Sequence, residues 1–268
     1  MEALNYWRKA LALLRGTWMP NFRNKYPVDV AACDSIISIA QRAPKFVLPV
    51  SGHIFHDNLR GLPEILKLPF DEILIEYRSG TNNEVMDTAF PDSNTDAPKR
   101  VVVAGQKSDA IEVFSIIGTD SGAWCLQPWS CKIVKGVTGE TPPDAVLQDM
   151  RIIEGLALKF TPIGGMAVGI AGEQWQRHAY YDMMNERRAV LELIEALSCC
   201  NVTHEALPAR HQNKCAQRRG ALPFDDYRVL VIKSSHEGSG RAGVVGEHNS
   251  PREHLRRGHI RRLPDRKI

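Results

Sequence analysis

Three short runs of valine and isoleucine, separated by glycines, constrain the fold of this chain more than any other feature. The runs cover residues 100–104, 111–117 and 130–135, and the turn-forming sequence Gly-Thr-Asp-Ser-Gly occupies 118–122. β-branched residues between turn-forming residues are typical of strands joined by tight turns. The pattern therefore predicts a short antiparallel β-meander near the middle of the chain.

Apolar residues spaced three and four apart predict helices on both sides of this meander. Amphipathic helices are expected over residues 2–15 and 29–42, and the longest helical pattern runs over 173–197. Further elements are expected as strands over 72–78, 202–207 and 227–233 and as a basic helix over 209–219. We therefore predict an α+β fold with N-terminal helices, a short antiparallel β-meander, a long amphipathic helix and a basic C-terminal α/β segment.

Charge is distributed unevenly along the 268 residues. Residues 201–268 contain 14 Lys and Arg against 7 Asp and Glu, a balance of +7, so the first 200 residues carry −4 of the overall +3. Six of the nine histidines also lie after Asn201. We therefore divide the chain into a mildly acidic α+β body at 1–200 and a basic module at 201–268. A basic module of this kind suits a partner rich in phosphate or carboxylate.

Composition excludes several classes of protein. The chain is 43% hydrophobic and 24% charged, which rules out a collagen, a coiled-coil rod and a wholly disordered chain. No stretch approaches a run of about 18 uninterrupted apolar residues, so we predict neither a membrane span nor a membrane partner. The six cysteines lack Cys-x-x-Cys spacing, and no apolar stretch of the secretory type opens the chain. We therefore expect reduced thiols and a cytoplasmic location.

The most distinctive motif is Ser-Pro-Arg-Glu-His-Leu-Arg-Arg-Gly-His-Ile-Arg-Arg-Leu at residues 250–263. Arginine offers planar donors that suit phosphate, and histidine can move protons near neutral pH. One interpretation is binding of RNA or DNA phosphates. A second is a metal-independent nuclease in which His254 and His259 serve as general acid and base, and a third is a solvated basic strand. The candidate phosphate-binding residues of the motif are Arg252, Arg256, Arg257, Arg261 and Arg262.

The basic helix expected over 209–219 provides a second candidate contact. Arg210, Lys214 and Arg218 are spaced four apart, so they share one face of the helix. That face either contacts phosphate alongside the motif or is simply exposed to solvent. Lys214 and Arg218 therefore join the candidate nucleic-acid-binding residues.

Other patterns indicate no cofactor and no metal. His53 and His56 would lie on one side of a helix, as metal ligation requires, but no third ligand is identifiable. The glycine-rich stretch at 164–172 lacks both the P-loop sequence and the dinucleotide-binding fingerprint. A remaining possibility is an inhibitor or scaffold that binds a host bacterial protein through the acidic body and a long polar loop at 79–99.

Five short segments in the C-terminal third of the chain form a recognisable pattern when they are taken in their order along the sequence. They occupy residues 197–202, 213–214, 220–227, 229–232 and 250–261. This pattern resembles a family of phage and prophage proteins of unknown function. The resemblance implies a phage-derived accessory protein in the bacterial cytoplasm and assigns no catalytic residue. Members of that family continue past the basic motif into an apolar strand containing Trp-Val, so we expect this chain to be a truncated form whose last residues pair poorly.

Overall fold

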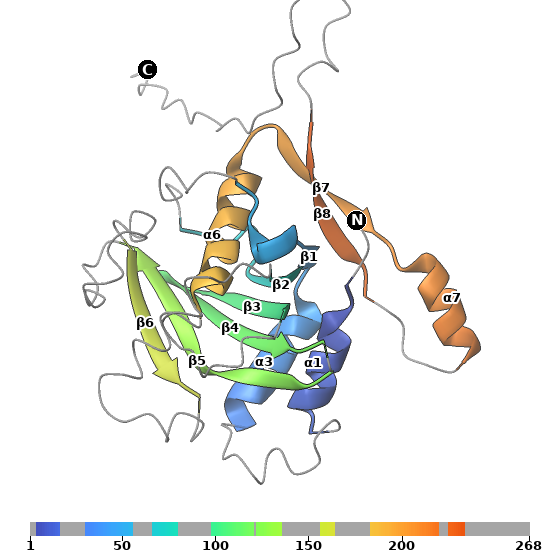
Figure 1. Ribbon diagram of the computed structural model, residues 1–268. Coiled ribbons are helices and arrows are strands. Elements are labelled where there is room, and N and C mark those ends of the chain that lie inside the picture. Colours follow the sequence, from blue (N-terminus) through green and yellow to red (C-terminus); the bar gives the residue numbers. More distant parts are fainter. Residues whose placement is uncertain are drawn as a thin grey trace, which may run out of the picture.

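A single mixed sheet of eight strands organises the protein (Figure 1). The computed structural model describes residues 4–16, 30–55, 66–79, 98–120, 122–135, 156–163, 183–219 and 225–233. The strands are β1 (Lys45–Val47), β2 (Glu72–Arg78), β3 (Lys99–Lys107), β4 (Ala110–Gly118), β5 (Trp124–Lys135), β6 (Leu156–Pro162), β7 (Val202–Leu207) and β8 (Tyr227–Ile232). The helices in the described ranges are α1 (Tyr6–Leu14), α3 (Val30–Arg42), α6 (Met184–Ser198) and α7 (Arg210–Arg218), together with the 3-10 turn η1 (Val50–Gly52).

The strand order β6-β5-β4-β3-β2-β1-β8-β7 joins local and distant parts of the chain. Strands β2 to β6 pair antiparallel in succession, and β7 pairs antiparallel with β8. The short strand β1 lies between these two groups and pairs in parallel with both β2 and β8. Through β1, the C-terminal hairpin becomes part of the same sheet as the central strands.

Each face of the sheet supports its own apolar core. Ile73, Ile75 and Tyr77 of β2 point into the core beneath α6, whereas Leu74 points into the core beneath α1 and α3. This alternation follows from the two-residue repeat of a strand. Figure 1 shows the result, with α6 on one side of the sheet and α1 and α3 on the other.

The predicted fold class is wrong. The three runs expected to form a short meander lie in β3, β4 and β5, but these strands are the middle of a large mixed sheet that dominates the described residues. The long amphipathic helix expected over 173–197 is also wrong, because α6 begins at Met184, has 15 residues and buries several charged side chains. Those buried charges have partners, such as Arg100 and Ser115 for Glu186, which a local pattern cannot reveal.

Several other expectations fall partly or wholly outside the described residues. They are the glycine-rich stretch, the first part of the long helix, most of the polar loop at 79–99 and the truncated end of the chain. The division of the chain at residue 200 stays a prediction from charge, although the sheet itself continues across that point through the β8–β1 pairing.

Among the helices of the described ranges, none combines the length and apolar character needed to cross a membrane.

Candidate nucleic-acid interface

Helix α7 contains the two predicted site residues that the structure describes. It connects β7 to β8 and lies to one side of the sheet (Figure 1). Lys214 and Arg218 belong to it. The arginines predicted in the basic motif (Arg252, Arg256, Arg257, Arg261 and Arg262) and the candidate acid and base His254 and His259 all lie outside the described residues.

One contact at the start of α7 ties the helix to the hairpin. The backbone N–H of Ala209 donates to the Asp226 carboxylate at 3.1 Å, which places a negative charge at the positive end of the helix. At the other end, the N–H of Arg219 donates to the carbonyl of Ala216 at 3.0 Å and closes the last turn of the helix itself. Ala209 and Ala216 are buried.

Basic residues in the last turns of α7 and at its C-cap are exposed. Lys214 and Arg218 share one helical face, Arg219 follows them at the C-cap, and the helix sequence contains neither aspartate nor glutamate. The two acidic residues that come next along the chain are already engaged, since Asp225 lies 3.4 Å from the Lys45 ammonium and Asp226 accepts from the N–H of Ala209. In the part of the chain that the structure describes, no carboxylate pairs with these three cations.

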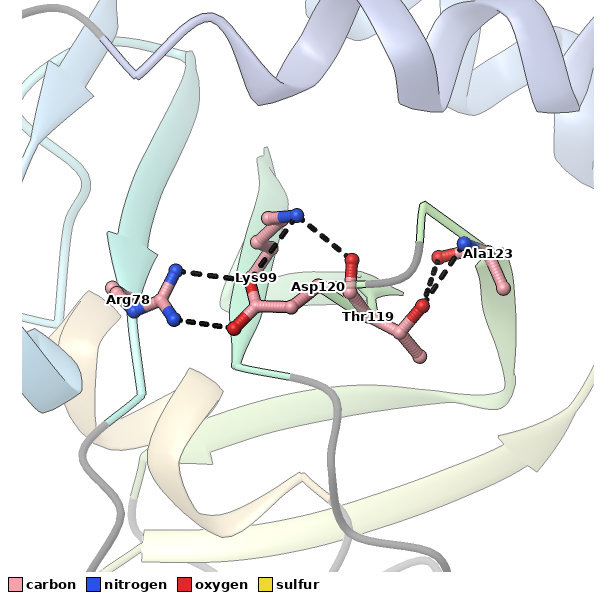
Figure 2. Close-up of polar contacts among 5 residues, drawn as sticks. All are labelled: Arg78, Lys99, Thr119, Asp120 and Ala123. Carbon is pink, nitrogen blue, oxygen red and sulfur yellow. Dashed lines mark hydrogen bonds and ion pairs between the residues drawn. The ribbon is translucent and has the colours of Figure 1, made fainter.

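At an edge of the body near the predicted polar loop, by contrast, the cations pair with a carboxylate, as Figure 2 shows. The guanidinium of Arg78 holds both carboxylate oxygens of Asp120, at 3.1 and 2.6 Å, and Lys99 adds a contact at 3.3 Å. The Arg78 hydrogen bond is the main reason that the pKa of Asp120 lies below its ordinary value. Lys99 also donates to the carbonyl of Thr119 at 2.8 Å. The cations at this edge are thus paired within the protein.

A second basic feature lies on the β7–β8 hairpin, and the sequence analysis missed it. Arg228 of β8 places its guanidinium carbon 4.9 Å from the ring centre of Phe70. Its Nη1 atom lies 3.1 Å from Nε2 of His204 on β7. The Phe70 and His204 ring centres are 5.9 Å apart, and all three side chains are half-buried. No local pattern could have found this cluster, because its members come from three separate segments.

His53, the described member of the predicted histidine pair, belongs to a structural anchor. The fully buried Glu192 of α6 accepts from the backbone N–H groups of Ile54 and Phe55 and from Arg188, and His53 Nδ1 lies 3.4 Å away. Burial raises the pKa of this carboxyl, but these hydrogen bonds outweigh the effect and bring the pKa below its ordinary value. The carboxylate fixes the chain after η1. Among the described residues, no group of three or more His, Cys, Asp and Glu could hold a metal.

A second buried carboxylate joins α1 to the hairpin strand β8. Glu76 of β2 accepts from the backbone N–H groups of Tyr6 and Trp7 at 3.1 and 2.7 Å, and from the Tyr227 hydroxyl at 2.7 Å. Burial is the main cause that raises the pKa of Glu76 to about 7. The residue therefore positions β8, and with it the cluster around Arg228, relative to the body.

Comparison with known protein families, with curated proteins and with solved structures finds no match to this chain. Its function is therefore inferred from its own residues. The surface with the clearest chemical character among the described residues is the exposed basic surface of α7 and its C-cap, formed by Lys214, Arg218 and Arg219. We call this surface the α7 basic face.

Proposed function

We propose that this protein binds nucleic-acid phosphates through its basic C-terminal module, with the α7 basic face as one contact surface. The observation that supports the proposal is an exposed helical face with two cations, extended by a third at the C-cap, and no described carboxylate partner for any of them. A protein can use such cations to displace the counterions of a polyanion, which favours binding at low salt. The arginine-rich motif at 250–263 supplies a second set of contacts of the same chemistry.

The spacing of the α7 basic face suits a phosphate backbone. Lys214 and Arg218 are four residues apart, and a helix rises about 1.5 Å per residue, so their positions differ by about 6 Å along its axis. Successive phosphates of one DNA strand are separated by about 3.4 Å along the duplex axis. The two side chains can therefore reach different phosphates, and arginine can hold its phosphate with two hydrogen bonds.

We place this activity in the bacterial cytoplasm, as that of a phage-encoded accessory protein. The resemblance of the C-terminal segments to phage and prophage proteins supports the bacterial setting. None of the six cysteines is in a disulfide in the structure, although Cys125 is exposed, and cysteines without disulfides are typical of a reducing compartment.

A charge-matched pair of double variants tests the proposal. Fluorescence anisotropy of labelled RNA and DNA would be measured at about 50 and about 200 mM salt. We expect Lys214→Ala/Arg218→Ala to bind every sequence more weakly, with a shallower salt dependence, because two phosphate contacts are lost. The control Arg15→Ala/Lys107→Ala removes one exposed arginine and one exposed lysine from the body, and it should retain the wild-type slope.

Two results would contradict the proposal. One is the absence of binding by the wild-type protein at low salt. The other is an equal salt slope in the α7 variant, the body variant and the wild type. Gel analysis of each probe after the measurement shows whether the nucleic acid stays intact or is cleaved, and cleavage would favour the nuclease interpretation of His254 and His259.

A further inference from the structure

Arg228 is held in an arrangement that suits the flat face of a nucleobase. Its guanidinium lies over the ring of Phe70, and Phe70 in turn contacts the fully buried Phe46 with ring centres 6.1 Å apart. His204 packs with its edge against Phe46, with ring centres 6.0 Å apart. The cluster is thus anchored in the core by one side and remains half-exposed on the other.

The contact between Arg228 and His204 orients both side chains. Nη1 of Arg228 lies 3.1 Å from Nε2 and 3.5 Å from Nδ1 of His204. A guanidinium can only donate hydrogen bonds, so the imidazole is the acceptor in this contact. Among the described residues, no carboxylate pairs with Arg228. The guanidinium is thus oriented by the Phe70 ring and the His204 imidazole, and most of its N–H groups remain available to a ligand.

The β7–β8 pairing places this cluster at the same end of the hairpin as α7. Arg228 is opposite Ala206 across the pair, and Ala206 lies three residues before Ala209 at the start of the helix. On the other strand, Asp226 caps α7 and lies two residues before Arg228. One extended ligand at this end of the hairpin can therefore contact both the Arg228 cluster and α7.

We propose that Arg228, Phe70 and His204 form a stacking subsite that selects single-stranded over double-stranded nucleic acid. The proposal rests on the function proposed above and names the class of nucleic acid. The α7 basic face supplies sequence-independent phosphate contacts, which a duplex and a single strand both offer. A planar guanidinium held on an aromatic ring adds a stacking surface for an unpaired base. A duplex keeps its base faces stacked inside, so it gains nothing from this subsite.

Two conservative variants separate stacking from charge. Arg228→Lys keeps the positive charge but removes the planar guanidinium, and Phe70→Leu keeps an apolar side chain but removes the ring. Both would be compared with wild type in anisotropy titrations with a single-stranded oligonucleotide and a duplex of the same sequence. RNA and DNA versions of each probe would show which sugar is preferred. Thermal melting would confirm that each variant is folded, and Phe70→Leu provides an independent test if Arg228→Lys unfolds.

We expect the wild type to bind the single strand more tightly than the duplex. Each variant should lose about tenfold in affinity for the single strand, while its duplex affinity and salt slope stay unchanged. If both folded variants bind the single strand as wild type does, while Lys214→Ala/Arg218→Ala still weakens binding, the subsite is refuted and phosphate binding stands. If the wild type binds neither probe at low salt, both proposals fail.

Discussion

The buried carboxyl of Glu76 makes a specific prediction about how stability varies with pH. Its pKa is raised from 4.5 to about 7 in the folded protein, chiefly by burial. The unfolded chain therefore releases this proton at lower pH than the folded protein does. Between about pH 4.5 and pH 7, the unfolded state binds fewer protons, so this group's contribution to the free energy of unfolding falls as pH rises. Below that window its contribution is fully present.

The size of the effect follows from the pKa difference. A shift of about 2.5 units at about 1.4 kcal/mol per unit gives about 3 kcal/mol, as an order of magnitude. Glu76→Gln removes the ionisable group. The amide resembles the protonated carboxyl of the wild type at pH 5, because each presents a donor as well as an acceptor to Tyr6, Trp7 and Tyr227. The variant should thus be close to wild type in stability at pH 5, and it should gain up to about 3 kcal/mol relative to wild type by pH 8.

Urea unfolding at several pH values between 5 and 8, followed by tryptophan fluorescence, measures this gap directly. Other titrating groups are shared by the two proteins and cancel in the difference. The control Glu72→Gln lies on the same strand and removes an ion pair with the largely exposed Arg42, so its gap to wild type should stay nearly constant. A stability difference between Glu76→Gln and wild type that stays constant, or that shifts in favour of wild type as pH rises, would refute the assignment.

Two further predictions concern the turn after β1 and its anchor. Gly52→Ala should destabilise the protein by about 2 kcal/mol or more, because Gly52 has φ +71° and an added Cβ would lie 3.1 Å from the Cβ of Ala189. Gly122→Ala, at φ +95° in open space, should cost less in the same thermal unfolding assay, and equal losses would contradict the crowding argument. Glu192→Ala should cost about 3 kcal/mol in urea unfolding, because it leaves Arg188 and two backbone N–H groups without their acceptor. Glu112→Ala, which breaks a longer 3.8 Å contact with Lys132, should cost below about 1 kcal/mol, and the account is wrong if the two losses match.

Strands with a clear local pattern could be located from the sequence, and their arrangement could not. The strands expected at 72–78 and 202–207 have those bounds as β2 and β7. The three-residue β1 is too short to show a repeat, and β6 lies in a stretch for which the sequence predicted no strand. The parallel β1–β8 pairing joins residues far apart in the chain. Without it, the eight-stranded sheet cannot be inferred.

In the candidate site, too, the sequence predicted what depends on a local pattern and missed what depends on tertiary pairing. The four-residue spacing of Lys214 and Arg218 was enough to place both on one helical face, and the structure leaves both exposed. In α6 the amphipathic pattern could not show that Glu186 and Glu192 are buried, where they pair with Arg100 and Arg188. The Arg228–Phe70–His204 cluster depends on the β7–β8 register and on a residue before β2. Tertiary pairing of this kind has no signature in a local pattern.

The central claim is that the α7 basic face contacts nucleic-acid phosphates. The salt dependence of binding by Lys214→Ala/Arg218→Ala, measured beside wild type and Arg15→Ala/Lys107→Ala, tests it most directly. The account predicts that the slope of log affinity against log salt becomes shallower by about one unit for each lost phosphate contact, and only in the α7 variant. A slope that matches wild type in the α7 variant would contradict it.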